Sequence, residues 1–262
     1  GFVAALEHTR ERAVPVVVLK VGRTEVSARM AATHSGAIAG NDAAYQAVFE
    51  RYGVVRVTDL YEMASSLALL SSPRQPGPGG LAVIGDSGGE RGMLVDLAAD
   101  LDVPFADIGT ETQAKLRARL SPELEPVNPT DAWGNRHDYV GVFRDCYHAL
   151  VDDPDTAIAV MLRDLRTGEE LSENMTRVVA ETLSRTEKPV ALATNFSGVA
   201  HRELVLKAVA AGVPVLDGTR QMLRAVKHAF DYRDFRARPA ELAPAPPAGA
   251  AARWRAELSA GG

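Results

Sequence analysis

One histidine stands among small residues that would let a large charged partner reach its ring. His34 lies in the stretch Ala-Ala-Thr-His-Ser-Gly-Ala-Ile-Ala-Gly, residues 31–40. A neutral imidazole with an unperturbed pKa of about 6.5 is a competent nucleophile at physiological pH. Once phosphorylated, it carries a doubly charged group that requires backbone N–H donors and helix N-termini. The stretch therefore predicts either a phosphoryl-carrying histidine in a loop or a solvated histidine in an ordinary strand-to-helix connection.

The elements expected around His34 place it at the edge of a sheet where ligands bind. The apolar residues 16–19 predict a parallel strand, and a helical pattern opens at Asn41 and Asp42. Open α/β sheets bind their ligands at the carboxyl ends of such strands. The small residues between His34 and that helix would allow close backbone approach to an anion, and the helix could lend its amino end.

Composition describes a soluble globular chain that binds neither nucleic acid nor membranes. The 262 residues suit two α/β domains, with 46% hydrophobic and 24% charged residues and a formal net charge of −5. Basic residues are scattered among acidic ones, so no positive field would gather DNA or RNA. No apolar run approaches the roughly 18 residues that span a bilayer, and the first residues lack a leader pattern. We therefore expect a cytoplasmic protein.

Neither cysteine nor histidine spacing predicts a metal site. Cys146 is the single cysteine and lies in an apolar helical pattern, which predicts a small buried residue. The six histidines show none of the short spacings that build a ligand set on one element. We expect no metal to be held by the protein.

Residues 1–72 predict only part of a sheet domain. The pattern is that of a helix, a strand, the histidine loop, a helix, a strand and a helix, with strands over 14–21 and 54–57. Two parallel strands are too few for a stable sheet covered on both faces. We therefore expect residues 1–72 to be the C-terminal part of a domain whose front half would precede Gly1.

Residues 73–80, dense in Pro and Gly, predict a linker to a second domain over 81–235. That domain shows five strand-then-helix units, typical of an open parallel sheet of order 2-1-3-4-5. The strands are expected at 81–86, 103–108, 156–162, 188–194 and 213–217, and the helices at 89–101, 110–120, 169–186, 200–211 and 219–230. An insertion over 127–134 leads to a further helix over 138–151, and an Ala/Pro-rich tail follows at 236–262.

Two glycine turns follow strands of the second domain. Gly85–Gly92 leads from the first strand into its helix, and Thr194–Gly198 follows the fourth strand. Exposed N–H groups at the positive end of a helix suit an anion, but neither turn matches a dinucleotide fingerprint or a P-loop. Each turn is therefore either a tight strand-to-helix connection or part of an anion site, and their common sheet edge suggests a cleft.

Several segments resemble the NDP-forming (ADP-forming) acyl-CoA synthetases, which are relatives of succinyl-CoA synthetase. Lys20–Thr24 matches K-x-G-R-S/T, residues 33–42 match S/T-H-S/T-G-A/S-x-A-G-S/N-D/E, and residues 53–57 match G-V/I-x-R-V. Asn128-Pro129-Thr130-Asp131 and Gly85–Gly89 resemble turns of the next domain of that family. The resemblance covers residues 1 to about 235. It implies an α/β chain with two flavodoxin-like, succinyl-CoA synthetase-like parallel-sheet domains, the first incomplete at its N-terminus.

The resemblance also implies a reaction and a set of site residues. In that family a carboxylic acid, CoA and ATP become acyl-CoA, ADP and phosphate, and a histidine on a mobile loop carries the phosphoryl group. His34 takes the carrier role by direct match. Its phosphate-holding surroundings would be Ser35, Gly36, Ser87, Gly88 and Gly89. This chain has Asp86 where the family often has Asn, so an acidic residue stands in the Gly85–Gly92 turn.

The remaining parts of such an enzyme are expected outside residues 1–262. The resemblance implies a CoA-binding domain before Gly1 and an ATP-grasp domain after Gly262, in the same chain or a partner subunit, with a homo-oligomer left open. The full enzyme would use ATP with Mg and CoA. This sequence shows no basic cluster able to hold a triphosphate, so we expect the fragment to hold no cofactor and to be inactive alone. The alternative is a synthetase-like regulatory region of a protein lysine acyltransferase.

Overall fold

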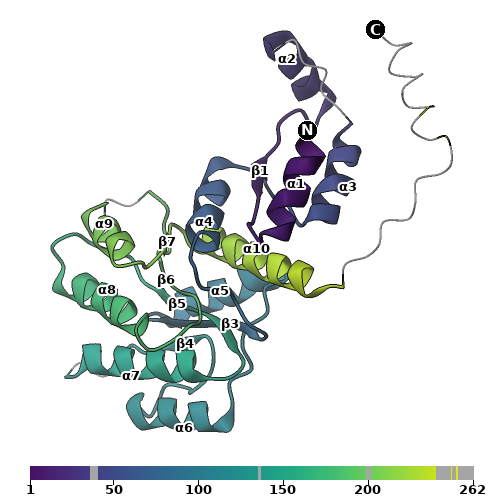
Figure 1. Ribbon diagram of the computed structural model, residues 1–262. Coiled ribbons are helices and arrows are strands. Elements are labelled where there is room, and N and C mark those ends of the chain that lie inside the picture. Colours follow the sequence, from purple (N-terminus) through teal and green to yellow (C-terminus); the bar gives the residue numbers. More distant parts are fainter. Residues whose placement is uncertain (36–40, 135–136, 199–201, 240–248, 250–251, 253–262) are drawn as a thin grey trace.

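The computed structural model of the chain describes residues 1–35, 41–134, 137–198 and 202–239, together with residues 249 and 252 (Figure 1). The helices are α1 (Phe2–Glu11), α2 (Glu25–Ser35), α3 (Asp42–Tyr52), α4 (Leu60–Leu70), α5 (Gly88–Asp100), α6 (Thr110–Arg119), α7 (Tyr139–Asp152), α8 (Glu170–Thr182), α9 (Arg202–Ala210) and α10 (Thr219–Ala237). The strands are β1 (Val17–Leu19), β2 (Val55–Val57), β3 (Gly80–Gly85), β4 (Thr130–Asp131), β5 (Thr156–Leu162), β6 (Val190–Ala193) and β7 (Val215–Leu216). Within these ranges, no helix is both long enough and apolar enough to cross a bilayer.

Five parallel strands form the main sheet, in the order β4-β3-β5-β6-β7. The central strand β5 has the run Thr-Ala-Ile-Ala-Val-Met-Leu, and all of its residues are buried. Such a continuous apolar run is expected where helices cover both faces of a parallel sheet. Helices α6 to α9 pack on one face, and α5 and α10 pack on the other. The predicted doubly covered parallel sheet is confirmed.

At one edge of this sheet the predicted order holds, but the strand is shorter than predicted. The expected strand at 103–108 forms only an isolated bridge to β3, and the short strand β4 continues the same edge. Asn128 links the pieces, because its Oδ1 accepts from the Val83 N–H at 2.9 Å and its Nδ2 donates to the carbonyls of Leu81 at 2.8 Å and Ala106 at 3.0 Å. One side chain thus replaces ladder hydrogen bonds that a longer strand would make.

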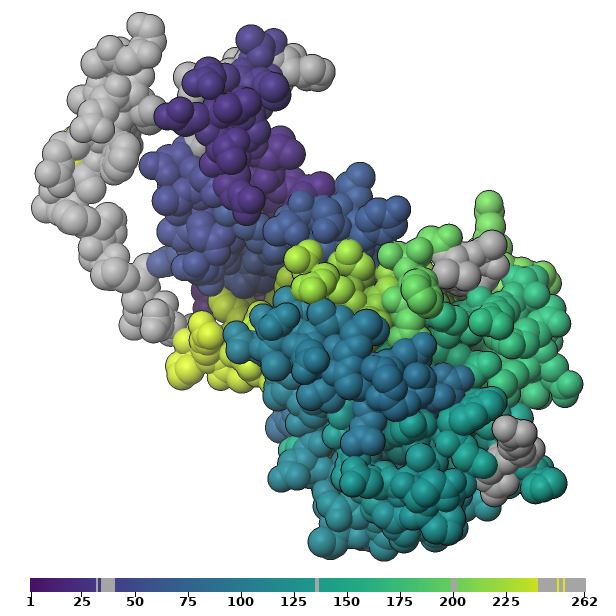
Figure 2. Space-filling view, turned by 180° about the vertical axis from the view of Figure 1, so that it is seen from behind, coloured from purple at the N-terminus to yellow at the C-terminus, as the bar shows by residue number. Residues whose placement is uncertain are grey.

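The first part of the chain packs on the main sheet through β2 and α4. Val57 of β2 and Leu69 of α4 are buried in the same apolar core as Val83 of β3 and Leu223 of α10. Helix α4 lies along α10, and Figure 2 shows the yellow-green α10 between the purple-to-blue first part and the teal body of the sheet. The apolar core therefore continues from one side of residues 73–80 to the other.

Arginine side chains fasten the segment 73–80 to the main body. Arg74 donates hydrogen bonds to the carbonyl of Leu183 at 2.7 Å and to that of Thr186 at 3.2 Å. Arg233 of α10 donates to the carbonyls of Gly77 at 2.9 Å and Gly79 at 3.0 Å. The bonds from Arg233 satisfy backbone carbonyls that a Pro- and Gly-rich stretch cannot pair within a helix or ladder.

The strand pair β1–β2 carries the histidine segment, and here a helix replaces a predicted loop. The two strands are parallel. The sequence predicted a loop from the end of β1 to Asn41, but residues 25–35 form α2. Thr24 Oγ1 accepts a hydrogen bond from the Ser27 N–H at 3.2 Å, and the residues that follow, mostly Ala, Arg and Met, favour a helix. The backbone of His34 therefore lies in the last turn of a helix.

The C-terminal end also differs from the prediction. Helix α10 continues to Ala237, whereas the sequence predicted its end at 230 and an Ala/Pro-rich tail from 236. Apart from residues 238, 239, 249 and 252, the rest of that tail lies outside the described residues.

Candidate functional site

One carboxylate anchors the base of the segment that carries His34. Asp42 Oδ1 accepts hydrogen bonds from Lys20 Nζ at 3.2 Å and from Arg56 Nη2 at 2.7 Å. The bond from Arg56 lowers the pKa of Asp42, because the guanidinium favours the carboxylate form. Lys20 precedes α2, Asp42 opens α3, and Arg56 lies in β2. Each of the three motif segments of the first part therefore contributes one residue to this contact.

The same contact joins the two ends of the chain between β1 and α3. Lys20 Nζ also lies 4.7 Å from the centre of the Tyr45 ring, and Arg56 Nη1 donates to Gln46 at 2.9 Å. Lys20 and Asp42, which flank residues 21–41, are thus held together. Figure 1 shows α2 projecting at the outer end of the first part. We call residues 21–41 the arm, and the contact of Asp42 with Lys20 and Arg56 is its base. The backbone of His34 lies in the last turn of α2, away from this base.

The amino end of α3 offers less to an anion than the sequence indicated. Asn41 caps α3, with its side chain accepting from the Ala43 N–H at 2.9 Å, and Asp42 adds an acidic group to the first turn. The side chains of His34 and Ser35 and the whole of Gly36 lie outside the described residues. The phosphate contacts of Ser35 and Gly36 therefore stay predictions.

The other expected phosphate-holding residues, Ser87, Gly88 and Gly89, form the amino end of α5. Ser87 is the N-cap, and its Oγ accepts from the Glu90 N–H at 3.3 Å. No acceptor in the described part of the chain bonds to the backbone N–H groups of Gly88 and Gly89. Free N–H groups at the positive end of a helix dipole suit one phosphoryl group.

Asp86, the acidic residue beside this turn, is paired. Arg163 Nη1 donates to the Asp86 carboxylate, and the Tyr139 hydroxyl donates to it at 3.4 Å. Arg163 also donates to the Tyr139 oxygen at 3.1 Å, and its Nη2 lies 3.7 Å from a Glu169 carboxylate oxygen. Only 8% of Arg163 is exposed, so the pair is shielded from solvent. The negative charge of Asp86 is therefore balanced beside the amino end of α5.

The two glycine turns meet at one cavity, as the sequence suggested. The cavity measures about 170 Å³ and is lined by Asp86, Glu90, Arg163, Asp164, Arg166 and Asn195. The Asn195 N–H donates to Asp164 Oδ1 at 2.8 Å, which holds the second turn against the end of β5. Burial, and then the charge of Asp86, raise the pKa of Glu90 above its ordinary value.

Sequence reasoning missed Arg163 and Asp164. Both directly follow the buried strand β5, at the carboxyl edge of the sheet, and that position was the available signal. Their roles could not be inferred, since the Asp86 that pairs with Arg163 lies 77 positions away in the chain.

The structure does not bring α2 and α5 together. Figure 1 shows α2 at the outer end of the first part, with α4 and α10 lying between it and α5. Among the described residues, no hydrogen bond or ion pair joins these two helices. The histidine segment and the expected phosphate site at Ser87–Gly89 are therefore separate in this structure.

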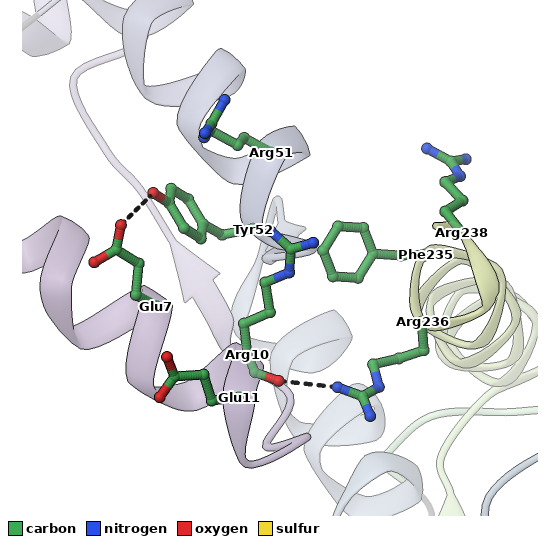
Figure 3. Close-up of a pocket in the computed structure, with 8 residues that line it drawn as sticks. All are labelled: Glu7, Arg10, Glu11, Arg51, Tyr52, Phe235, Arg236 and Arg238. Carbon is green, nitrogen blue, oxygen red and sulfur yellow. Dashed lines mark hydrogen bonds between the residues drawn. The ribbon is translucent and has the colours of Figure 1, made fainter. Parts of the chain in front are cut away.

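A larger cavity lies where three helices end (Figure 3). It measures about 540 Å³, and its lining includes four arginines, Arg10, Arg51, Arg236 and Arg238. Arg236 donates to the Arg10 carbonyl at 2.9 Å, and the Tyr52 hydroxyl donates to Glu7 at 3.2 Å. Helix C-termini carry partial negative charge, so arginines near them stabilise the ends of α1, α3 and α10. We interpret this cavity as a structural junction where the C-terminal ends of α1, α3 and α10 pack together, and we call it the joint. The sequence showed no basic cluster because these arginines are far apart in the chain.

The described residues form no metal-binding site. They contain no group of three His, Cys, Asp or Glu side chains arranged to hold a metal ion. Cys146 lies on the buried side of α7, and burial raises the pKa of its thiol to about 12. The thiolate form is therefore disfavoured.

Sequence comparisons point to one family. Residues 1–70 match the succinyl-CoA ligase like flavodoxin domain. Over 47% of the chain, the sequence is 36% identical to the ADP-forming acetate–CoA ligase I of Archaeoglobus fulgidus. Over 86% of the chain, it is 27% identical to the alpha subunit of ADP-forming acetate–CoA ligase I of Pyrococcus furiosus. The matches span only 18% and 48% of those relatives.

A solved structure supports the same fold. The dinucleotide forming acetyl-coenzyme A synthetase 1 of Ca. Korarchaeum cryptofilum, in complex with phosphate and ADP, matches with a TM-score of 0.74. The identity is 22%, and the match covers 90% of this chain and 50% of that chain. Residues 1–70 therefore carry the succinyl-CoA ligase like flavodoxin domain, and the chain as a whole is similar in sequence to ADP-forming acetate–CoA ligases.

Proposed function

We propose that the chain is the central part of an NDP-forming acyl-CoA synthetase in which His34 carries the phosphoryl group. The overall reaction would convert a carboxylic acid, CoA and ATP to acyl-CoA, ADP and phosphate. The observation that carries the proposal is the base of the histidine segment, where Lys20, Asp42 and Arg56 meet. Two relatives are named as ADP-forming acetate–CoA ligases, which supports a small carboxylic acid as the substrate.

The carrier role requires a nucleophile that can be loaded and unloaded. An imidazole nitrogen of His34 attacks the γ-phosphorus of ATP, so that an N–P bond forms while the P–O bond to ADP breaks. The carboxylate of the acid then takes the phosphoryl group, which returns the histidine to its free form. The CoA thiol finally attacks the acyl phosphate, loses its proton and displaces inorganic phosphate.

The amino end of α5 supports a docking point for the phosphoryl group. The last turn of α2 ends in carbonyls with partial negative charge, so a phosphoryl dianion on His34 needs donors from another element. Gly88 and Gly89 offer free N–H groups, and Arg163 balances Asp86 beside them. Since α2 and α5 lie apart, either the arm that carries His34 moves on its base or a second copy of the chain supplies the α5 end.

Other domains would supply the remaining ligand sites. We propose that a CoA-binding domain and an ATP-grasp domain, in the same chain or a partner subunit, hold CoA and ATP with Mg. The Pyrococcus furiosus relative is named as an alpha subunit, which supports a division between chains. The fragment itself would hold neither cofactor tightly and would be inactive alone.

Labelling tests the carrier directly. The assembled synthetase is incubated with γ-labelled ATP, and we expect an acid-labile, base-stable label on the chain. His34→Ala should abolish the label without loss of cooperative unfolding, whereas His8→Ala, at an exposed position of α1, should keep it. Asp42→Asn should slow labelling on the order of tenfold, because a misplaced reactive group reacts more slowly. Label that persists on His34→Ala contradicts the carrier role. ATP or CoA binding with no label on the wild type would favour the regulatory alternative.

A further inference from the structure

A small cavity opens at the carboxyl ends of β1 and β2, at the foot of α2. It measures about 230 Å³, and three cationic side chains line it: Lys20, Arg23 and Arg56. Thr24, Ser27 and Thr58 line the same space, and the Thr58 hydroxyl already donates to Glu62. The carboxyl ends of neighbouring parallel strands are where open α/β sheets bind their ligands. The position and the lining both indicate a polar ligand.

Among the described residues, the lining of this cavity holds three cationic side chains and no carboxylate. One carboxylate, Asp42, binds both Lys20 and Arg56, and it is not part of the lining. Arg23 has no hydrogen-bond or ion-pair partner among the described residues.

A second carboxylate, Glu62, accepts hydrogen bonds from the N–H and the hydroxyl of Thr58, and it is paired with Arg224 at 3.1 Å. The lining itself therefore carries three positive charges, of which, in the described part of the chain, only those of Lys20 and Arg56 have a carboxylate partner. A lining of this charge favours a doubly charged anion.

The side chains of Lys20 and Arg56 are already partly ordered. Their exposed fractions are 13% and 19%, and Asp42 fixes both through the same oxygen. An anion entering the cavity would therefore lose little additional side-chain entropy at these two residues. Thr24 and Ser27 exchange hydrogen bonds at 3.1 Å and 3.2 Å, and both are accessible enough to turn a hydroxyl toward a ligand. Arg23 is the guanidinium left for a direct contact.

We propose that this cavity binds a phosphate group as its dianion, either free or on a small metabolite. The site is distinct from the histidine. An 11-residue helix rises about 15 Å, so the cavity and the backbone of His34 lie at opposite ends of α2. It is also distinct from the joint in Figure 3, where the carbonyl ends of three helices offset the arginine charges. The inference therefore goes beyond the carrier role and does not require it.

Titration of the isotope-labelled 262-residue chain with inorganic phosphate tests the site. We expect saturable amide shift changes confined to residues 21–27 and 56–58. Sulfate should give the same pattern, whereas acetate at equal ionic strength should bind at least tenfold more weakly because it carries one charge. If a phosphorylated metabolite displaces inorganic phosphate at these amides, the ligand is a phosphate group on a metabolite. If phosphorylated metabolites fail to displace it, the ligand is free inorganic phosphate.

Two arginine variants locate the binding energy. Arg23→Ala should weaken phosphate binding about tenfold or more, and Arg23→Lys should restore part of it, since charge is retained but the planar fork is lost. Arg51→Ala removes a matched exposed arginine from the joint and should change nothing. Loss of binding in Arg51→Ala alone, shifts confined to residues 87–90, or shifts that never saturate would each overturn the proposal. Labelling of His34 is measured independently, so failure of the carrier role leaves this result interpretable.

Discussion

The ring of Phe235 in α10 occupies the place where a β-carbon on Gly53 would lie. Gly53 ends α3 with a φ of 64°, in the left-handed region that glycine tolerates best. An alanine there costs roughly 1 kcal/mol for the backbone alone, and the ring must also shift. We expect Gly53→Ala to lower the free energy of unfolding by about 2 kcal/mol, measured by urea denaturation.

Gly92 provides the matched control. It lies inside α5, and apart from the backbone of that helix nothing comes within 4 Å of the place that a β-carbon would take, so Gly92→Ala should raise stability by up to about 1 kcal/mol. Adding Phe235→Ala to Gly53→Ala should remove the steric part of the cost and leave only the backbone part. Equal effects of the two glycine substitutions would refute the close contact between α3 and α10.

The shielded pair of Asp86 and Arg163 should behave as one unit. Removal of Arg163 alone leaves a carboxylate without its partner in a poorly solvated place, so Arg163→Met should cost about 3 kcal/mol of unfolding free energy. Adding Asp86→Asn removes the uncompensated charge and should recover at least half of that cost. A double-mutant cycle measures the coupling, and strictly additive effects would show that the pair does not hold the α5 turn.

The stability of the α4–α10 contact should fall in acid through His228. Its Nδ1 lies 2.9 Å from Ser66 Oγ, and its Nε2 lies 3.5 Å from a Glu62 oxygen. Burial lowers the pKa of His228, and the charge of Glu62 offsets this only in part. Below the unfolded value of about 6.5, the unfolded chain binds more protons than the folded one, so stability is lost as pH falls from 7 toward 5.

Comparison of variants isolates this titration. Asp231, Lys227 and Arg224 of α10 also act on His228, and their opposing signs leave burial dominant. We expect His228→Gln to unfold with a smaller loss of stability between pH 7 and pH 5.5 than the wild type. His8→Gln, at an exposed site on α1, should follow the wild type. An unchanged slope in His228→Gln would contradict the assignment.

Local patterns predicted most of the main sheet. The apolar run of β5 and the glycine turns after β3 and β6 were readable because a parallel strand and its following turn are specified by neighbouring residues. The strand expected at 103–108 was wrong in extent, because Asn128, from a later segment, supplies the hydrogen bonds that hold that edge. No local pattern reveals such a tertiary bond.

The candidate site was predictable only where its parts are local. Small residues around His34 indicated a loop, but the Thr24 cap and the helix-favouring residues after it form α2. The contact of Lys20 and Arg56 with Asp42 and the pairing of Arg163 with Asp86 join distant positions, so spacing in the chain could not show them. The role of His34 itself stays a prediction, since its side chain lies outside the described residues.

The core shared by α4 and α10 decides where the molecule can be divided. The Pro- and Gly-rich stretch 73–80 invites separate production of the part that follows it. Such a shortened protein would lack α4 and β2, and the apolar side of α10 that they cover would face water. A hydrophobic strip of this kind promotes self-association and insoluble product. A soluble shortened protein must therefore include α4 together with the main sheet, although the Pro- and Gly-rich residues 73–80 separate the two in the chain.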